Sequence, residues 1–420
     1  MDVLERFLKY VKIDTQSDPD CSQTPSTEKQ FDLARVLVDE LKELGITQVE
    51  LTDDCYVYAK IPGNLSEEEA KRTPKIGFIA HLDTAPSAPG ANVNPQVIHN
   101  YDGEDIVLQN GAVTSVKIFP ELKNYKGDDL VVTDGTTLLG ADDKAGVAEI
   151  MALADYLVHH PEEKHGEISL GFTPDEELGL VAEGFNIEKF DADFAYTLDG
   201  GAIGEIIYEN FNAASAQVFL TGVEVHPGSS KGKMVNSLLI AREFSMLLPE
   251  CTPANTEKYE GFFHLDRLQG NVEKTFMDYI IRDHDRDKFE KKKEIFLEAV
   301  DFLKKKYEGT GLQIECRMKN QYFNMREKIE PYPFLIEAAR NAYRSLGIEP
   351  WSAPMRGGTD GAKYSYQGLP CPNLAVGGGN FHGKYEYASV QKMEQMVQVI
   401  LKISQELIGK KDEKKYKQKE

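Results

Sequence analysis

Closely spaced cysteines are missing from this sequence. The chain has five cysteines in 420 residues, and no two of them form a C-x-x-C pair. An odd number of scattered cysteines argues against a disulfide framework and against a structural zinc site built from cysteine. We therefore expect reduced thiols and a cytoplasmic protein.

Long apolar stretches are missing as well. The first residues, MDVLERFLKYVKID, mix charged and apolar side chains at helical spacing and lack the apolar core of a secretory signal. No apolar run approaches the length of about 20 residues that a membrane-spanning helix needs. The sequence therefore predicts a soluble protein without a membrane partner.

Positive charge is scarce relative to negative charge. The 48 Lys and Arg residues stand against 69 Asp and Glu residues, which gives a formal net charge of −21 at pH 7. Contact with the phosphates of a nucleic acid needs clustered Lys and Arg side chains. The charge balance therefore argues against nucleic acid as a partner.

The first half of the chain alternates between strand-like and helix-like segments. QVELTDDCYVYAKIPG resembles a hairpin, and KIGFIAHLDT resembles a buried strand. A helical segment, GVAEIMALADYLVHH, precedes two further strand-like segments, EISLGFTP and FDADFAYTLDGG. This alternation predicts an α/β domain with a mostly parallel sheet and helices on both faces.

The pattern changes near residue 210, which indicates a second domain. Residues 211–325 follow the order strand, helix, strand, strand, helix, strand, which suits a small four-stranded sheet backed by two helices. The α/β pattern then resumes with PFLIEAARNAYRSLG and NLAVGGG. We predict a discontinuous α/β domain, residues 1–210 and 326–420, and an inserted α+β domain, residues 211–325.

Reactive polar residues follow several of the strand-like segments. The clusters are HLD at 81–83, DEE at 175–177, DGG at 199–201, His382, and ADDKAG with Asp142 and Asp143. Taken singly, each has an ordinary interpretation, such as a helix N-cap for ADDKAG or a turn for DGG. Ligands in open α/β sheets bind at the carboxyl ends of the strands. If all these carboxylates converge on this edge, a cation is needed to offset their negative charge.

Histidine nitrogens with carboxylate oxygens are typical zinc ligands, and manganese or cobalt can substitute. His81 and Asp83 are two residues apart on an extended segment, so Asp83 could orient a metal-bound His81. Glu176 and Glu177 would point apart on an extended segment, so that one could bind metal while the other faces water and substrate. A two-metal site needs a bridging carboxylate, for which Asp142 is the candidate.

Seven segments of the chain resemble motifs of the dinuclear zinc peptidases, the family of the aminoacylases and dipeptidases. In chain order they are IAHLDT, LLGADDKAG, FTPDEELG, YTLDGG, VHPG, MRGGTDG and NFHGKYEY. The resemblance covers nearly the whole chain, and FNAASAQV and YFNMREKI are especially similar to tripeptide-cleaving members. It implies a metal-dependent aminopeptidase for tripeptides, with two zinc ions per subunit, an inserted lid and dimerisation domain, and a homodimeric assembly.

The resemblance also implies roles for individual residues. The metal ligands would be His81, Asp142, Glu177, Asp199 and His382. Asp142 would bridge the two ions, Asp83 would orient His81, and Glu176 would act as the general base. The family pattern further implies a cis peptide bond between Asp142 and Asp143.

Substrate contacts are expected from four further residues. Relatives use a histidine at the position of His226 to polarise the scissile carbonyl, although a histidine before a proline turn also has an ordinary structural interpretation. Arg282 and Arg356 could bind a peptide carboxylate, because a guanidinium group matches a carboxylate in a two-pronged contact. Asn236 could join them.

Two other functions remain open on the sequence. A related two-zinc amidohydrolase, which acts on acylated amino acids or dipeptides, would have the same metal centre and differ in its pocket. A silent relative would bind metal or peptide without cleaving it. Such a relative would have no need for Glu176 and Asp83, so their presence argues against it.

Overall fold

The computed structural model describes residues 1–179 and 184–411, which divide into two compact units. Unit 1 contains the described residues of Met1–Tyr208, Glu327–Ser352 and Lys363–Glu420. Unit 2 contains Glu209–Arg326 and Ala353–Ala362. The sequence pattern places the segment 353–362 in the larger domain. It packs in unit 2 instead, where Phe211 N donates a hydrogen bond to Gly357 O.

A seven-stranded mixed sheet lies at the centre of unit 1. Its strands, in spatial order, are β1 (Gln48–Leu51), β2 (Val57–Ile61), β8 (Ile168–Thr173), β3 (Ile76–His81), β9 (Phe194–Gly200), β15 (Asn373–Ala375) and β10 (Ile206–Ile207). Strands β8, β3, β9 and β15 pair in parallel. The pairs at both edges are antiparallel, including the predicted β1–β2 hairpin. The sheet is therefore parallel at its centre rather than along most of its width.

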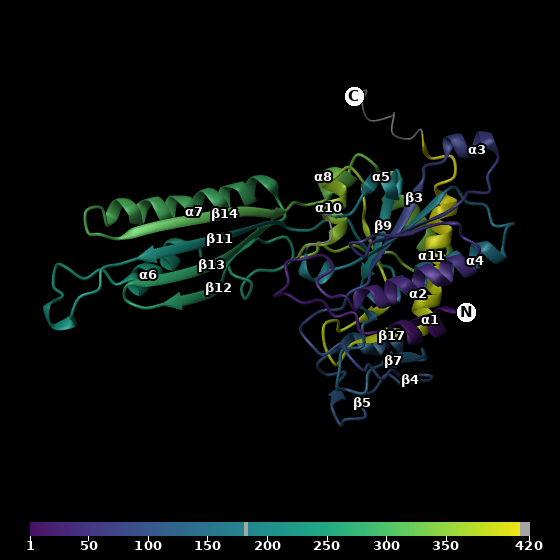
Figure 1. Ribbon diagram of the computed structural model, residues 1–420, viewed down its shortest axis with the longest axis horizontal. Helices are drawn as coiled ribbons and strands as arrows, with labels where there is room; N and C mark the ends of the chain where they lie inside the picture. The colour runs from purple at the N-terminus through teal and green to yellow at the C-terminus, as the bar shows by residue number, and fades with distance from the viewer. Residues whose placement is uncertain (180–183, 412–420) are drawn as a thin grey trace. The chain divides into compact units, whose positions relative to one another are not determined.

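Helices cover both faces of this sheet, as predicted (Figure 1). The helices of unit 1 are α1 (Val3–Tyr10), α2 (Gln30–Glu43), α3 (Glu67–Arg72), α4 (Ala141–His159), α5 (Ile187–Phe190), α9 (Pro333–Ser345) and α11 (Val390–Glu406). Helix α4 packs on β3 and β9 and contacts α1 and α11. On the other face, α5 packs on β2 and β8 beside an aromatic cluster that includes Tyr58, Phe185 and Tyr364. Strands β3 and β8 are buried at every position because both faces are covered.

Short strands form a second sheet in unit 1 that the sequence pattern did not predict. Its order is β16 (Gly378–Gly379), β17 (Tyr387–Ser389), β7 (Leu130–Val132) and β4 (Gln96–Ile98). A separate two-stranded ribbon joins β5 (Ile106–Val107) to β6 (Val113–Thr114), and a 3₁₀ helix, η1 (Pro120–Tyr125), follows. Through β17, this sheet connects the chain around His382 to the chain that leads into α4.

Unit 2 has the predicted order of elements. They are β11 (Asn212–Thr221), α6 (Ser237–Leu247), β12 (Phe262–Gly270), β13 (Lys274–Asp283), α7 (Arg286–Lys306) and β14 (Gln313–Tyr322). The strands form an antiparallel sheet in the order β12-β13-β11-β14, along which α6 and α7 pack (Figure 1). Phe289, Phe296 and Leu303 form the buried stripe of α7, as their helical spacing predicts.

Four short helical segments complete the fold. They are η2 (Glu176–Leu178), η4 (Pro227–Ser229), α8 (Arg326–Ile329) and α10 (Asp360–Tyr366). In the part of the chain that the structure describes, the helices lack the combination of length and apolar character that crossing a membrane requires.

Candidate metal centre

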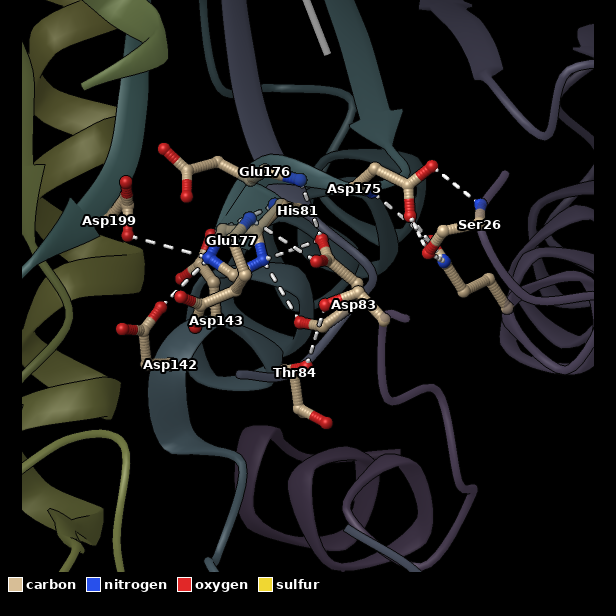
Figure 2. A network of polar contacts seen from close by, with 12 residues as sticks. Ser26, His81, Asp83, Thr84, Asp142, Asp143, Asp175, Glu176, Glu177 and Asp199 are labelled. Carbon is tan, nitrogen blue, oxygen red and sulfur yellow. Dashed lines mark hydrogen bonds and ion pairs between the residues drawn. The ribbon is translucent and has the colours of Figure 1, made fainter. Parts of the chain in front are cut away.

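Parallel strands bring the candidate site residues to one edge of the large sheet. His81 is the last residue of β3 and lies level with Thr173, the last residue of β8. Asp199 is near the end of β9, the other neighbour of β3. The acids at 175–177 follow β8 directly, so the carboxyl ends of three adjacent strands supply polar side chains to the same place. Figure 2 shows Asp142, Glu177 and Asp199 close to His81, whereas the Asp175 side chain points toward Ser26.

The two ring nitrogens of His81 have different partners. Nδ1 lies 3.0 Å from the main-chain oxygen of Asp83 and 3.3 Å from its Oδ1 atom. Nε2 lies 2.8 Å from Asp142 Oδ1 and 3.6 Å from Asp199 Oδ1. A ring that donates through Nδ1 directs the Nε2 lone pair at the two carboxylates, which is where a metal ion would bind.

Asp142 lies between two histidines, and each of its carboxylate oxygens faces a different one. Oδ1 is 2.8 Å from His81 Nε2, and Oδ2 is 3.0 Å from His382 Nε2. The same nitrogen of His382 lies 3.1 Å from Glu177 Oε1. The Asp142 carboxylate therefore has one side toward His81 and Asp199 and the other toward His382 and Glu177. The peptide bond between Asp142 and Asp143 is cis, as predicted.

Burial and mutual hydrogen bonds shift the pKa values of this cluster. Burial raises the pKa of Glu177 and raises that of Asp199 to about 7. Hydrogen bonds to Asp142 and Glu177 raise the pKa of His382 to about 10. Burial opposes the ionisation of Asp142 as well, but hydrogen bonds from His382 and His81 hold its pKa below the usual range. The histidines and carboxylates of the cluster thus hold protons between them, and a divalent cation can take the place of these protons.

The donor atoms of the cluster fit a divalent metal ion. Three potential ligand atoms lie within 4.8 Å of one another in the group His81, Asp142 and Glu177, and also in the group His81, Asp143 and Asp199. Oδ1 of Asp143 is buried without a hydrogen-bond partner. A mixture of imidazole nitrogen and carboxylate oxygen suits zinc. Asp143 was not among the predicted ligands, and its other oxygen accepts a hydrogen bond from His81 N (3.0 Å).

The acids at 175–177 form a turn rather than an extended segment, which corrects the expected geometry. Asp175 has a left-handed conformation with a φ of 55°, and the 3₁₀ helix η2 follows it. The main-chain N–H groups of Glu176 and Glu177 donate to the two oxygens of Asp83, at 2.9 and 3.2 Å. In Figure 2 the Glu176 side chain points away from Asp175, toward the side of the cluster where Asp199 lies.

Asp175, for which the sequence predicted no role, anchors this turn from behind. Its buried carboxylate accepts hydrogen bonds from Ser26 N and Gln30 Nε2, both at 2.7 Å, and from Ser26 Oγ (Figure 2). The main-chain N–H of Asp175 donates in turn to Gln30 Oε1 (3.2 Å). The segment at 26–30 thus holds the turn from which Glu176 and Glu177 project.

Sequence reasoning missed several side chains that hold the main chain of the candidate ligands. Asn373 Oδ1 accepts from Asp199 N (3.0 Å), and Ser87 Oγ donates to the main-chain oxygen of His382 (2.8 Å). Glu386 accepts from Asp142 N (3.0 Å). Glu386 belongs to the NFHGKYEY motif, so a signal was present, but the motif does not reveal the partner.

The four predicted substrate-binding residues belong to unit 2. His226 is exposed at the start of η4, and Asn236 caps α6 by accepting from Leu238 N (3.0 Å). Arg282 donates to two main-chain oxygens of its own sheet and lies over the ring of Tyr322. Arg356 donates to the main-chain oxygens of Lys258 and Glu260 and to Thr256 Oγ1. Each residue therefore has a structural contact within unit 2.

A comparison of the sequence with models of known protein families agrees with the fold and with the cluster of histidines and carboxylates. Residues 130–406 match the model of peptidase family M20/M25/M40, and the chain belongs to this family of peptidases. Along nearly its whole length it is similar to peptidase T. Peptidase T of Clostridium perfringens strain 13 is 55% identical over 403 residues, which cover 96% of this chain and 98% of that protein. Peptidase T of Caldanaerobacter subterraneus subsp. tengcongensis is 55% identical over 413 residues, covering 97% and 99%.

Solved structures with the same fold agree with this family. The aminopeptidase PepT from Bacillus cereus ATCC 10987 superposes with a TM-score of 0.77 at 22% identity, over 96% of this chain and 98% of that chain. A dinuclear metal-binding peptidase of the M20 family from Bacillus subtilis superposes with a TM-score of 0.65 at 13% identity, over 96% of both chains. The predicted family and the predicted fold class are therefore confirmed, and the substrates of the chain are peptides.

Proposed function

We propose that the chain is a zinc-dependent aminopeptidase that releases the N-terminal residue of tripeptides. One observation carries the proposal: the two carboxylate oxygens of Asp142 face two different histidines, His81 and His382. Such a carboxylate suits a bridge between two metal ions. The similarity to peptidase T at 55% identity over 96% of the chain supports an aminopeptidase of this kind.

The candidate ligands divide into two sets that share Asp142. His81 and Asp199 would complete one zinc site, and His382 and Glu177 would complete the other; cobalt or manganese could substitute for zinc. When bound, such a pair of ions lowers the pKa of a water molecule and polarises the carbonyl group that is attacked.

Glu176 is proposed as the general base. It would accept a proton from the attacking water and return it to the amine that leaves. Asp83 supports this role, because its carboxylate holds the main chain of Glu176 and Glu177 while it also contacts the ring of His81. A fixed main chain keeps the base at a constant distance from the reacting atoms.

Residues of unit 2 are proposed to bind the substrate. His226 Nδ1 accepts a hydrogen bond from Gly228 N (3.1 Å), so a neutral ring carries its proton on Nε2. That N–H group can donate to the carbonyl oxygen on which negative charge develops. Arg282 and Arg356 would bind the peptide carboxylate, and Asn236 would assist them.

A homodimer in the cytoplasm is also proposed. Helix α6 exposes Leu239 (60%) and Met246 (74%), and β12 exposes Leu268 (51%). Apolar side chains of this kind suit a subunit interface. All five cysteines are free, which suits a reducing compartment. Sedimentation of the purified protein measures the assembly, and a monomer would contradict the proposed dimer.

Hydrolysis of defined peptides tests the proposed activity. A tripeptide should release its free N-terminal residue, a chelator should abolish the release, and zinc or cobalt should restore it. Glu176→Gln should retain zinc and lose most activity, because general-base catalysis contributes about 10²–10⁴-fold. A zinc-loaded Glu176→Gln variant with wild-type activity would exclude Glu176 as the base.

Two alternatives are separated by the same assay. A related amidohydrolase or dipeptidase would prefer acylated amino acids or dipeptides to the tripeptide. The fold does not discriminate, because an aminoacylhistidine dipeptidase from Vibrio alginolyticus superposes with a TM-score of 0.60 at 15% identity. A non-catalytic relative would bind zinc or peptide and release no amino acid from any short peptide.

A further inference from the structure

Glu386 is a buried residue beside the candidate metal centre. The proposed mechanism assigns no role to its carboxylate. Its side chain is 1% exposed. Oε2 accepts hydrogen bonds from the main-chain N–H groups of Leu139 and Gly140, both at 2.8 Å. Oε1 accepts from Asp142 N at 3.0 Å. One side chain thus binds three N–H groups of the segment that carries the candidate bridging residue.

This segment needs support because the hydrogen bonds of a regular helix do not hold it. Asp142 and Asp143 lie within α4, but their φ and ψ angles are not helical. Gly140, which precedes the helix, has a left-handed conformation with a φ of 83°. The first N–H groups of a helix lack partners within the helix, and a carboxylate can supply acceptors for them. Glu386 supplies these acceptors for Gly140 and Asp142.

A carboxylate suits this task better than its amide analogue. It has two acceptor oxygens and no donor, whereas a glutamine has one acceptor oxygen and an NH₂ group. In a glutamine, the NH₂ group would replace one of the two oxygens. It would then face either the N–H groups of Leu139 and Gly140 or the N–H group of Asp142, and two donors cannot form a hydrogen bond.

Glu386 also links two candidate ligands that are far apart in the sequence. His382 and Asp142 are 240 residues apart, and Glu386 follows His382 by four residues. Glu386 N donates to Gly383 O (3.2 Å), which closes a turn from Gly383 to Glu386, directly after His382. The same turn therefore presents His382 to Asp142 Oδ2 and the Glu386 carboxylate to Asp142 N.

We propose that Glu386 is a positioning residue of the metal centre: it holds the main chain of Leu139–Asp142 so that the Asp142 carboxylate stays between His81 and His382. The proposal rests on the proposed metal centre. Asp142 is a candidate ligand of both zinc sites, so a shift of its main chain should weaken zinc binding. The proposal therefore predicts a larger loss of zinc affinity than a substitution that only lowers the stability of the fold.

The experiment compares Glu386→Gln with a matched control, Glu40→Gln. Glu40 is another buried carboxylate of unit 1 and contacts Arg6, Lys9 and Tyr10. Zinc affinity is measured by competition with a chelator, and amide hydrogen exchange is measured on the metal-free protein. We expect Glu386→Gln to bind zinc about 10–100-fold more weakly, as is typical when a side chain that supports a ligand is changed. We expect Glu40→Gln to retain the wild-type affinity.

Amide exchange gives a readout that does not depend on zinc. In the wild type, the amides of Leu139, Gly140 and Asp142 should exchange slowly, and Glu386→Gln should accelerate them. If Glu386→Gln does not fold, fast exchange of these amides in the wild type would still overturn the proposal. An unchanged zinc affinity in folded Glu386→Gln would overturn the positioning role and leave the metal centre intact. An equal loss in Glu40→Gln would also overturn it, and a wild type that binds no zinc would overturn both proposals.

Discussion

At the scale of single residues, three adjacent acids have three different environments. Asp175 binds Ser26 and Gln30 and does not face the cluster. The Glu177 carboxylate lies beside His382, and the Glu176 side chain points toward the side where Asp199 lies (Figure 2). The left-handed turn at Asp175 separates the three carboxylates, so that side-by-side charges in the sequence are not side by side in space.

Asp175→Ala should destabilise the protein, because it leaves buried donors of Ser26 and Gln30 without their acceptor. Each of the three donor groups costs about 1–3 kcal/mol when its acceptor is lost, so we expect a loss of about 3 kcal/mol or more in the free energy of unfolding, measured in urea. Asp175→Asn retains one acceptor oxygen and should lose less. A change within about 0.5 kcal/mol for Asp175→Ala would show that these hydrogen bonds contribute little.

Zinc affinity should increase with pH. His382 has a pKa of about 10 beside Asp142 and Glu177, and the pKa of His81 is also raised by its carboxylate partners although burial opposes this. The His382 imidazole is therefore protonated in the metal-free protein at neutral pH, and a histidine must lose this proton before its nitrogen can bind zinc. Binding thus releases protons, and the affinity should rise with pH up to about 10, the pKa of His382. Calorimetry in buffers of different ionisation enthalpy measures the release, and an affinity independent of pH would contradict the prediction.

At the scale of elements, α1 is fastened to two helices by a buried ion cluster. Arg6 lies between Glu40 of α2 and Asp155 of α4, and its Nη2 donates to Asp155 Oδ2 at 2.6 Å. Tyr10 OH also donates to Glu40 Oε2 (2.6 Å), and Lys9 Nζ lies 2.7 Å from Glu40 Oε1. Asp155 lies near the end of α4 that is remote from Asp142, so this cluster fastens the helix away from the candidate metal centre.

Glu40→Ala should destabilise unit 1 through Arg6, which would lose its buried acidic partner and keep the partly buried Asp155. Removing one member of a buried ion pair costs about 3–5 kcal/mol, and we expect about 3 kcal/mol because Asp155 remains. Lys9→Ala is the control, since Lys9 is half-exposed and should contribute less than about 1 kcal/mol. Equal effects of the two substitutions on urea unfolding would contradict a central role for the buried pair.

Element types followed from local pattern wherever the pattern was long. The stripe of α7 and the alternating β1–β2 hairpin were predicted correctly, because apolar periodicity reflects the burial of one face. The sheet of β16, β17, β7 and β4 was missed. Its strands have two or three residues each, which is too short for any period, and they pair across distant parts of the chain.

At the scale of the whole molecule, the two units have separate cores, and the candidate zinc ligands all belong to unit 1. The predicted substrate-binding residues belong to unit 2. Zinc should therefore stabilise one unit, while substitutions such as Arg282→Met should change substrate binding without changing zinc affinity.

Calorimetric unfolding with and without zinc checks this division. Zinc at 100 times its dissociation constant adds about 2.7 kcal/mol to the stability of the folded unit that binds it. We expect the transition of unit 1 to move to higher temperature and that of unit 2 to stay, with hydrogen exchange assigning each transition. Asp142→Asn is the control and should remove the zinc effect. A shift of the unit 2 transition alone would contradict the assignment of the ligands.

Local pattern was enough to predict the longer elements of both units, and short motifs were enough to predict the family, because periodicity and motifs depend on neighbours in the chain. The tertiary structure decided which atoms meet. His382 reaches Asp142 across 240 residues, Glu386 binds the main chain of Asp142, and the segment with Arg356 packs in unit 2. Contacts of this kind arise when distant segments approach in the folded chain, and spacing along the sequence does not encode them.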